Sequence, residues 1–356
     1  MKRTIARAAF LVIVALIAYL LAWPVPINPA SWTPPRAPEL TGVYAQNSEL
    51  SKIERLPVDG FAPEDVAIDD QDRIYCGTAD GRIFRFPADG ARPEVFANTQ
   101  GRPLGLIFDH DGNLIVADAV KGLLAIDPNG EIAALSTQAD GVPFRCTNDL
   151  DVAENGTIYF TDSSYKFSLT ELKAEILEHQ PNGRLLAFDP RTKQTRVIFP
   201  DLYFPNGVAV SPDQSFVLVC ETGSYGVRRV WISGPKAGQS DTFIDNLPGF
   251  PDGIASNGRD KFWLALVNRR DAALDALMPH PFLRKVVMRL PNFLQPNIKR
   301  YAFVLGLDTD GHVVQSLQDP SPKCFARISN VVEHKGKLYF GSIGESAIGC
   351  LSAVSK

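Results

Sequence analysis

The sequence predicts an all-β protein: a six-bladed β-propeller with an N-terminal transmembrane helix and a helical lid insertion. Three observations support this fold. An apolar run follows a few basic residues at the N-terminus, one hairpin-like pattern recurs six times, and the two longest gaps between these repeats hold helix-like segments. The 356 residues, of which 45% are hydrophobic, are enough to bury a large core.

Charge and cysteine content exclude several classes of function. The 36 Lys and Arg residues nearly balance the 40 Asp and Glu residues, for a net charge of −4, so the chain carries no electrostatic footprint for nucleic acid. The five cysteines are scattered, with no C-x-x-C pair and no histidine at zinc-ligand spacing. A zinc or iron–sulfur site and a dense disulfide framework are therefore not expected.

The N-terminal segment has the pattern of a membrane anchor. Three basic residues lie among the first seven and precede an uncharged run over 8–23 that ends at Pro24. This run is shorter than the roughly 20 residues of a typical span, so a cleaved secretory signal is the competing interpretation. We favour an uncleaved anchor over 1–23, because no clean A-x-A cleavage site closes the run.

The charge of the same segment predicts its orientation. Basic residues stay on the cytoplasmic side, so everything after residue 24 is expected outside the cytoplasm, in a periplasmic, lumenal or extracellular space. The Pro-rich stretch 24–40 is expected to be a stiff, extended linker, and 41–356 to form the propeller. The sequence thus predicts a single-pass membrane protein with the membrane as one partner.

Six segments share an alternating apolar run, a turn rich in Asp, Asn and Gly, and a second apolar run. This period-two pattern predicts β-hairpins. Three of the five steps between the segments fall between 40 and 46 residues, which matches the length of four-stranded propeller blades. Residues 41–56 are expected to join the last blade. The segments begin at Pro63, Pro103, Thr147, Pro205, Pro251 and Ser329.

The two longer steps need insertions, and both insertions have a helical pattern. One is the stretch 168–179. The other is a lid at about 269–300, where apolar positions mix with Arg and Lys and four prolines prevent a single long helix. Two interpretations of this lid are open: it lies on the membrane interface, as amphipathic basic segments do, or it packs on the face of the propeller.

The second residue of four of the repeats bears an oxygen ligand. The first strand of every blade lines the central channel, so residues at this shared position are expected to converge there. Two carboxylates and two amides suit Ca²⁺ rather than zinc or copper, and they leave coordination positions free for water or a substrate oxygen. The competing interpretation is a set of turn residues, because Asn-Gly and Asp-Gly are common turn formers. The four residues are Glu64, Asn148, Asn206 and Asp252.

A second pair of carboxylates follows two of these positions directly. Asp65 follows Glu64, and Asp149 follows Asn148, which gives a candidate second cation site deeper in the channel. Consecutive residues of a regular strand face opposite sides, so both members of each pair reach the channel only where the strand starts irregularly. Surface or turn aspartates are the alternative.

These motifs resemble the calcium-dependent six-bladed propellers of the gluconolactonase, senescence-marker-protein, paraoxonase and strictosidine-synthase-like superfamily. The most specific part is TNDLDVAENGTIYFTDSSYKFSL, which with GRLLAFDP and LYFPNGVAVSPDQSFVLVCET resembles the strictosidine-synthase conserved region, at about 145–232 here. With GRPLGLIFD, LPGFPDGI, the lid and the anchor, the chain is most similar to the arylesterase-like adipocyte plasma membrane-associated protein group.

The resemblance implies a catalytic calcium ion on Glu64, Asn148, Asn206 and Asp252, and a structural one on Asp65 and Asp149. It also reveals two departures from the superfamily. Leu104 stands where paraoxonases carry a catalytic histidine, and Ser329 stands where plant strictosidine synthases place their catalytic glutamate. The alkaloid condensation of those synthases is therefore not expected.

The leading hypothesis is a membrane-anchored, calcium-dependent hydrolase of lactones or aryl esters, in which the ion polarises the substrate carbonyl. Water is the expected nucleophile and Asp252 the expected general base, as in gluconolactonase-like relatives, with Glu64 as the alternative base. The second hypothesis is a non-catalytic, calcium-stabilised binding propeller, which Leu104 favours. A strictosidine-type lyase ranks third, because Ser329 cannot act as a carboxylate base.

Overall fold

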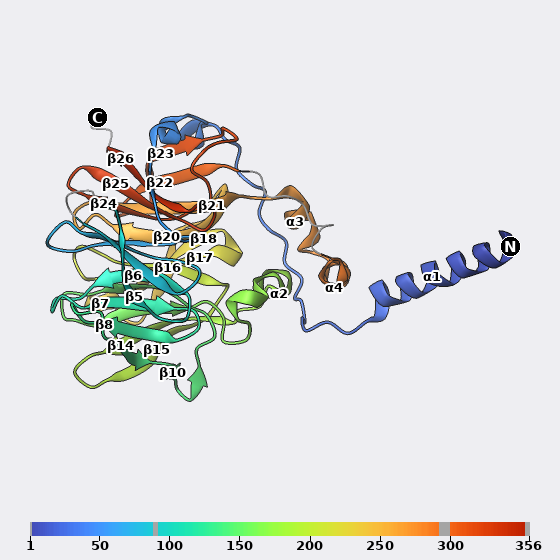
Figure 1. The fold of residues 1–356 in the computed structure, drawn as a ribbon, viewed down its shortest axis with the longest axis horizontal. Helices are drawn as coiled ribbons and strands as arrows, with labels where there is room; N and C mark the ends of the chain where they lie inside the picture. The colour runs from blue at the N-terminus through green and yellow to red at the C-terminus, as the bar shows by residue number, and fades with distance from the viewer. Residues whose placement is uncertain (1, 88–91, 292–299, 353–356) are drawn as a thin grey trace.

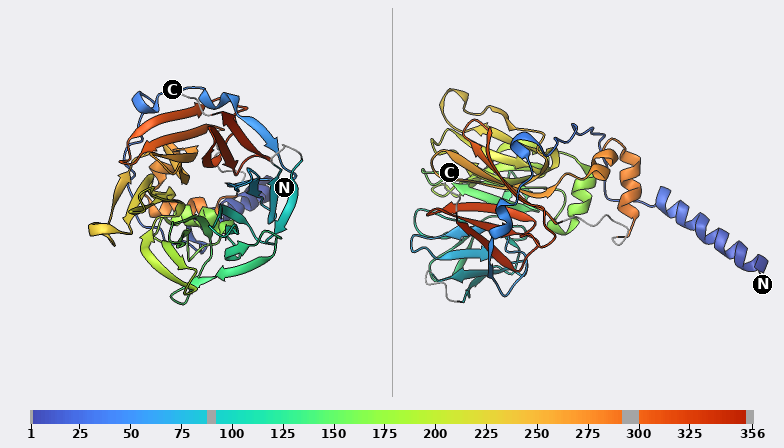
Figure 2. Two further views of the ribbon diagram at one scale, coloured as in Figure 1. Left: turned by 90° about the vertical axis from the view of Figure 1, so that its left-hand side faces the viewer. Right: turned by 90° about the horizontal axis from the view of Figure 1, so that it is seen from above.

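The computed structural model describes residues 2–87, 92–291 and 300–352. Within these residues, six four-stranded antiparallel sheets are arranged around a central channel (Figure 2), which confirms the predicted six-bladed propeller. Seen from the side, the sheets form a disc with three short helices on one face, and the N-terminal helix points away beyond them (Figure 1).

The strands form four concentric layers, one strand per blade in each. The innermost strands are β2 (Val66–Ile68), β6 (Pro103–Phe108), β12 (Thr147–Val152), β16 (Pro205–Val210), β20 (Gly249–Ser256) and β24 (Ile328–His334). The second layer is β3 (Ile74–Gly77), β7 (Leu114–Asp118), β13 (Ile158–Asp162), β17 (Phe216–Glu221), β21 (Lys261–Arg269) and β25 (Lys337–Ser342). The third layer is β4 (Arg82–Phe86), β8 (Gly122–Ile126), β14 (Gly183–Asp189), β18 (Gly226–Trp231), β22 (Ala302–Asp308) and β26 (Ala347–Ser352). The outermost strands are β5 (Glu94–Asn98), β9 (Ile132–Ser136), β15 (Gln194–Leu202), β19 (Ser240–Ile244), β23 (Val313–Asp319) and β1 (Glu54–Pro57), and a small hairpin of β10 (Gln138–Ala139) and β11 (Val142–Pro143) precedes the third blade.

Strand pairing between the two ends of the propeller closes the ring. β1 forms the outer edge of the sixth sheet and pairs antiparallel with β26, with Glu54 opposite Cys350. The N-terminal part of the propeller therefore joins the last blade, as the sequence predicts, and two short 3-10 helices, Gly42–Tyr44 and Glu49–Lys52, precede β1. All five cysteines are free and buried, so backbone hydrogen bonds rather than a disulfide close the ring.

Every predicted hairpin forms the innermost two strands of a blade. The apolar residues of these hairpins fill the spaces between neighbouring sheets, so the hydrophobic core is divided among the blade interfaces. One such core joins Ala67 and Tyr75 of the first blade to Leu106 and Leu114 of the second. Each blade is thus held mainly by its two neighbours.

The inner strands start irregularly. In five blades the pairing register between the first two strands shifts near the start of the inner strand, for example between Thr147 and Leu150 and between Pro251 and Ile254. In the first blade, regular pairing begins only at Val66. A β-bulge of this kind re-aims side chains, so it provides the irregular start that the predicted residue pairs require.

Side chains of one blade satisfy the backbone of the next blade at these irregular starts. The Ser163 hydroxyl donates to the carbonyl of Pro205 at 2.6 Å, and the Thr222 hydroxyl donates to the carbonyl of Pro251 at 2.6 Å. A buried backbone group without a partner would cost about 1–3 kcal/mol. These bonds therefore hold the starts of neighbouring inner strands at a fixed spacing.

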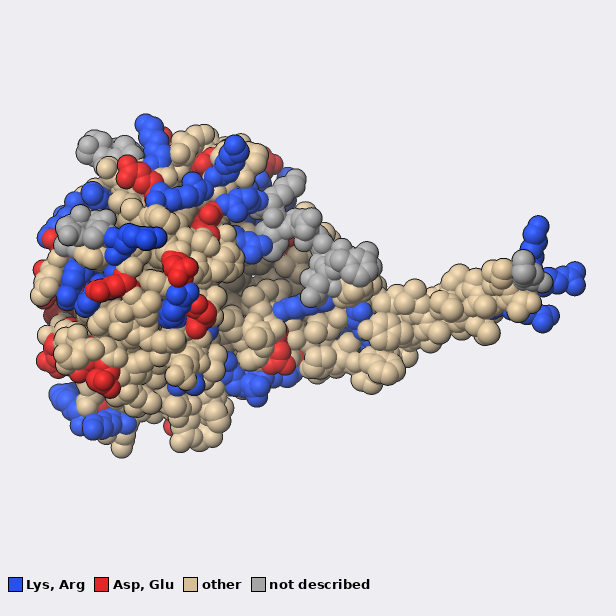
Figure 3. Space-filling model, viewed as in Figure 1, with Lys and Arg blue, Asp and Glu red and all other residues tan. Residues whose placement is uncertain are grey.

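α1 (Lys2–Ala22) has the dimensions of a membrane span. It has no buried residue, and its surface is uncharged except at its free end (Figure 3). Its 21 residues extend over about 31 Å, close to the thickness of the hydrocarbon core of a bilayer. Within the described part of the chain it is the one helix long and apolar enough to cross a membrane.

The lid packs on the propeller face and also contacts the end of α1. The predicted lid contains α3 (Ala272–Leu277) and α4 (Pro281–Arg289), and α2 (Leu172–Glu178), which a 3-10 turn at Leu169–Glu171 precedes, packs against α4. From here on, the lid means these three helices together. The predicted helix at 168–179 is confirmed, and residues 292–299 of the predicted lid lie outside the described residues. The fully buried guanidinium of Arg284 in α4 donates to the carbonyls of Leu177 and Glu178, where it complements the C-terminal end of the α2 dipole.

The Pro-rich segment 24–40 crosses the lid and is called the strap from here on. It is not a free spacer. Ile27 is buried against α2, and the backbone carbonyls of Asn28 and Pro35 accept hydrogen bonds from Gln180 and Arg270 at 3.1 and 2.6 Å. Extended Pro-rich backbone has no internal hydrogen bonds, so its carbonyls are free to accept from side chains. The predicted linker is therefore bound to the lid rather than free.

α2 places a buried acid, Glu175, on the side of the lid that faces the propeller. Its carboxylate accepts hydrogen bonds from the Ser164 hydroxyl at 2.7 Å and from the Asn182 amide at 3.2 Å. Burial raises the pKa of Glu175 to about 7, because the charged form loses its hydration, and repulsion from Glu178 adds to the shift.

The close approach of inner strands predicts a severe effect of Gly207→Ala. A Cβ atom there would abut the carbonyl of Asp252 and lie 2.7 Å from the Cα of Gly253 in the next blade. We expect the free energy of unfolding to fall by about 3 kcal/mol, measured by urea unfolding of the full chain in detergent. The matched control is Gly258→Ala, where φ is +72° and no atom lies within 4 Å of the added Cβ; it should cost about 1 kcal/mol. Equal losses in the two variants would contradict the close-approach argument.

The raised pKa of Glu175 predicts a pH-dependent loss of stability. The folded chain keeps the proton to about pH 7, whereas the unfolded chain releases it near pH 4.5, so this contribution is complete below pH 4.5 and is lost as pH rises to about 7. Between pH 5 and 8, the free energy of unfolding of wild type should therefore fall by up to about 3 kcal/mol relative to that of Glu175→Gln. The melting temperature of wild type should fall accordingly. The control is the exposed Glu131→Gln, which should follow wild type; parallel profiles for wild type and Glu175→Gln would refute the assignment.

Candidate metal centre

The four predicted ring residues stand at the starts of inner strands: Glu64 precedes β2, and Asn148, Asn206 and Asp252 lie in β12, β16 and β20. Asn206 and Asp252 stand two residues after Phe204 and Phe250, which line a cavity together with α2. The charge of Glu64 acts on Asp252, so these two carboxylates, from the first and fifth blades, lie near each other. Bulges at the starts of β16 and β20 change the direction of the side chains there.

A hydrogen bond orients the amide of Asn148 through its nitrogen atom. Nδ2 of the buried Asn148 donates to Ser163 Oγ at 2.9 Å, and this hydroxyl donates onward to the carbonyl that precedes Asn206. Asn206 lies near Asp252 and offsets part of the rise that burial causes in its pKa. Asn148 therefore keeps its carbonyl oxygen free, and this is the atom that a hard cation would bind.

Arg102 contacts one of the predicted ring residues, and the sequence patterns did not predict this contact. Its Nη2 lies 2.5 Å from Glu64 Oε2, and its Nη1 donates to the carbonyl of Ala62 at 2.9 Å. Burial raises the pKa of Glu64, while Arg102 opposes that shift. Its position directly before the second inner strand is the feature of the sequence that could have predicted this contact.

Asp252 is the most strongly perturbed carboxyl group of the four-residue set. Burial raises its pKa well above the ordinary value, and the charges of Glu64 and Asp149 raise it further. Arg102 pairs with Glu64, whereas Asp65, Asp149 and Asp252 accept hydrogen bonds from neutral groups. Around the channel, the described residues thus include more buried acids than cations that contact them.

This excess is the observation that fits a cation. Two carboxylates and two amides offer hard oxygen ligands, and a divalent ion would neutralise the repulsion that raises the pKa of Asp252. The four ligands also fall short of the six to eight oxygens that Ca²⁺ takes. The residues present thus fit a calcium ion with open coordination positions.

Asp65 and Asp149 join inner strands of adjacent blades. Asp65 Oδ2 accepts the backbone N–H of Leu106 at 2.7 Å, and Asp149 Oδ2 accepts that of Val208 at 2.9 Å. Burial raises the pKa of Asp65 to about 7 and that of Asp149 well above its usual range. Both line a channel cavity of about 190 Å³ on the far side of the ring residues from the lid. They are therefore neither surface nor turn residues.

The two departures from the superfamily have clear structural roles. Leu104 is buried against Ala119, Cys146 and Leu169, so an apolar contact with the lid occupies the position of the paraoxonase histidine. The Ser329 hydroxyl donates to the backbone carbonyl of Glu64 and links the last blade to the first. Neither side chain supplies a base at the channel mouth.

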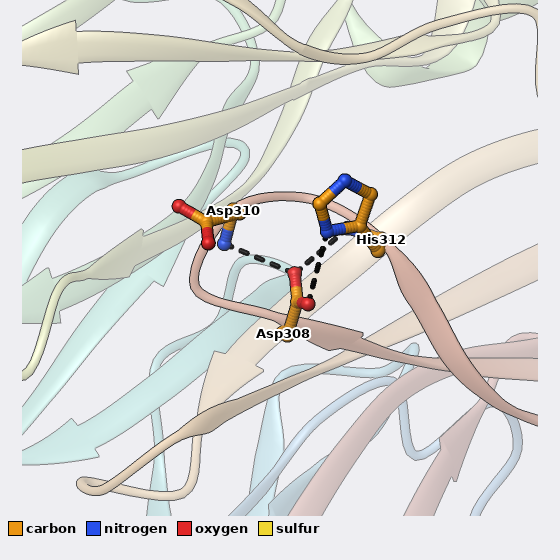
Figure 4. Close-up of side chains that lie close together, drawn as sticks. All are labelled: Asp308, Asp310 and His312. Carbon is orange, nitrogen blue, oxygen red and sulfur yellow. Dashed lines mark hydrogen bonds and ion pairs between the residues drawn. The ribbon is translucent and has the colours of Figure 1, made fainter.

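A second acidic group lies on the surface, in the turn between β22 and β23 (Figure 4). The ligand atoms of Asp308, Asp310 and His312 lie within 4.8 Å of one another, the only such group of His, Cys, Asp and Glu among the described residues. Asp308 Oδ1 accepts the backbone N–H groups of the other two residues at 3.0 and 2.8 Å. In the equivalent turn between β8 and β9, Asp127 accepts the backbone N–H groups of Asn129 and Glu131 at 2.9 Å each, so this arrangement is a hairpin turn that recurs in the propeller.

Comparisons with known proteins agree with this architecture. The strictosidine synthase model matches residues 148–235, and the N-terminal model of strictosidine synthase-like proteins matches residues 42–86. Among solved structures, a gluconolactonase from Xanthomonas campestris has a TM-score of 0.62 at 19% identity, covering 92% of this chain and 98% of its own. Regucalcin, a calcium-binding protein from Agrobacterium tumefaciens, has a TM-score of 0.60 at 14% identity, covering 84% and 93%. At these identities the likeness shows the fold alone.

Curated relatives are closer in sequence. Protein STRICTOSIDINE SYNTHASE-LIKE 6 of Arabidopsis thaliana is 40% identical over 294 residues, which cover 81% of this chain and 78% of the relative. Adipocyte plasma membrane-associated protein of Rattus norvegicus is 33% identical over 364 residues, which cover 96% and 97%. The predicted resemblance is confirmed, and the chain belongs to the strictosidine synthase-like family, together with the adipocyte plasma membrane-associated proteins.

Proposed function

We propose that this protein is a membrane-anchored, calcium-dependent hydrolase of lactones or aryl esters. One observation supports the proposal: Asp252 is a buried acid close to Glu64 and Asn206, and the cation Arg102 pairs with Glu64. The fold that the chain shares with a gluconolactonase supports the same reaction class. Glu64, Asn148, Asn206 and Asp252 would hold the ion.

When bound there, Ca²⁺ would polarise the substrate carbonyl and favour negative charge on its oxygen. Asp252 acts as the general base: its carboxylate takes a proton from water as the water oxygen bonds to the acyl carbon. The bond between the acyl carbon and the leaving oxygen then breaks, and the proton passes from Asp252 to that oxygen. The products are a carboxylic acid and an alcohol or phenol, or a hydroxy acid from a lactone.

The other residues of the centre position ligand atoms. Ser163 fixes the amide of Asn148, and Asn206 offsets part of the rise that burial causes in the pKa of Asp252. Asn148 and Asn206 cannot accept a proton at neutral pH, so they bind and orient. Arg102 fixes the Glu64 carboxylate and leaves Asp252 as the base.

A non-catalytic binding propeller is the second candidate. Leu104 favours it, because a buried apolar contact occupies the place of a catalytic histidine. In that case calcium would stabilise the fold and the channel mouth would bind a ligand without turnover. Ser329 gives the strictosidine-type lyase no support, since its hydroxyl is bound to a backbone carbonyl.

We further propose that α1 crosses the membrane once, with the propeller outside the cytoplasm. The basic residues at the free end of α1 support this orientation. Arg289 of α4 donates to the carbonyls of Leu20 and Trp23 at 2.8 and 2.6 Å, so it holds the lid at the end of the span. Phe282 and Leu283 of the same helix are exposed, as expected of a surface in contact with lipid headgroups.

The proposed orientation predicts the pattern of protease protection. In spheroplasts that express the full chain, external protease should digest the propeller, and alkaline carbonate should leave the chain in the membrane fraction. Digestion only after lysis would reverse the orientation. Release by carbonate would contradict a spanning helix.

The proposed chemistry predicts different effects of two changes at the centre. We expect the full chain in detergent to hydrolyse phenyl acetate or a small lactone with Ca²⁺ and to lose this activity with excess chelator. Asp252→Asn keeps an oxygen ligand but cannot accept a proton, so kcat should fall about 10²–10⁴-fold while Ca²⁺ still raises the melting temperature. Asn148→Ala removes a ligand and should weaken that thermal stabilisation.

The matched control is Asp310→Asn, in the exposed hairpin turn, which should behave as wild type. Turnover that persists in chelator or in Asp252→Asn would contradict the assigned mechanism. No turnover of any ester or lactone, with calcium still raising the melting temperature, would favour the binding propeller.

A further inference from the structure

We propose that the cavity under the lid is a binding site for a flat, uncharged aromatic ring, and that the side chain of Trp32 fills this site in the present structure. The inference rests on the proposed function only where the ring is taken to be part of the substrate. The cavity lies between α2 and the fourth blade. Its aromatic wall consists of Trp32, His179, Tyr203, Phe204, Tyr225 and Phe250.

The aromatic side chains are arranged as a stack rather than as a random apolar patch. Trp32 stacks on His179 with ring centroids 4.1 Å apart and planes inclined by 26°. His179 in turn stacks on Tyr203 at 4.8 Å and 28°. Trp32 also leans on Tyr225 at 5.7 Å, and Tyr225 meets Phe250 edge to face at 5.0 Å. The site therefore already accepts a flat ring between aromatic walls.

Three residues of the wall are held in strained backbone. His179, Phe204 and Tyr225 have φ angles of 50°, 50° and 58°, in the left-handed region that bulky residues avoid. Such conformations cost about 1–3 kcal/mol each and are concentrated at ligand-binding sites. All three line the same cavity, and His179 and Tyr225 are the C-terminal caps of α2 and of the 3-10 turn Thr222–Ser224.

The chemistry of the wall favours an uncharged ligand. His179 is buried, and burial together with the charge of Arg284 lowers its pKa to about 4, so the imidazole is neutral at physiological pH. Glu175 is the one acid among the lining residues, and its carboxylate is bound by Ser164 and Asn182. Thr222 donates to the carbonyl of Pro251. Glu175 and Thr222 thus have partners within the protein.

The cavity adjoins the metal centre. Phe204 and Phe250 precede Asn206 and Asp252 by two residues each, in the starts of neighbouring inner strands. The bond from Thr222 to Pro251 ties this wall directly to the strand that carries Asp252. A ring bound under the lid would therefore lie beside the backbone that positions the proposed base.

Trp32 belongs to the strap and not to the propeller. Its backbone N–H donates to the carbonyl of Met278 at 3.4 Å, and Ser31 bonds to the next carbonyl, that of Pro279. With the indole in place, only about 30 Å³ remains, which is room for roughly one or two water molecules. A ligand ring must therefore displace Trp32, and removal of the indole should open a site of its own shape.

The test is indole binding by Trp32→Ala, in the full chain reconstituted in lipid nanodiscs and followed by titration calorimetry. We expect the variant to bind indole at least tenfold more tightly than wild type, with one site per chain. Trp23→Ala removes an exposed tryptophan at the end of α1 and is the matched control, which should equal wild type. Trp32→Leu keeps a smaller apolar side chain and carries the same test if the alanine variant does not fold.

A folded Trp32 variant that binds indole no more tightly than wild type would overturn the proposal, as would an equal gain in Trp23→Ala, which would mean binding to the membrane end. Indole binding needs neither calcium nor turnover, so it is independent of the hydrolase assignment. Binding without any ester hydrolysis would retain the ring site and overturn the proposed reaction. Hydrolysis with no gain in indole binding would do the reverse.

Discussion

The hydrogen bonds that join the starts of neighbouring inner strands are the constraint on which this structure depends. At those points the strands are bulged, so their backbone groups lack regular partners within the blade. Hydroxyl groups of Ser163, Thr222 and Ser329 supply the missing partners from the adjacent blade. The same bonds hold the backbone from which the predicted ring residues extend, so the ring and the candidate metal centre depend on the same contacts between blades.

Concentration of acids at the channel has a cost that the fold does not remove by itself. Burial and mutual repulsion disfavour the charged forms of Asp65, Asp149 and Asp252, and backbone N–H groups compensate only part of this. An assembly of this kind is retained where a cation or a reaction uses it. Arg102 compensates the charge of Glu64 and, among the described residues, leaves Asp252 without a cationic partner in contact.

The membrane end of the chain and the site are parts of one assembly. The strap runs from α1 across the lid, where Arg284 ties α2 and α4 together and Trp32 enters the aromatic cavity. A change in the position of α1 relative to the lid would therefore move Trp32 in the cavity next to the strands that carry Asn206 and Asp252. The lid is thus more than a cover, because the segment that connects the propeller to the proposed anchor completes its inner wall.

The sequence by itself determined the blades, because alternation and turn residues are local properties that neighbouring residues decide. It also placed Glu64, Asn148, Asn206 and Asp252 at equivalent positions, since a repeat converts equal spacing in sequence into proximity in space. It missed the contact of Arg102 with Glu64 and the attachment of the strap. It also left the roles of Asp65 and Asp149 open. Those features depend on which side chains meet across blades and on where Trp32 packs, and only the tertiary structure decides such contacts, because they join segments whose separation along the chain carries no periodic signal.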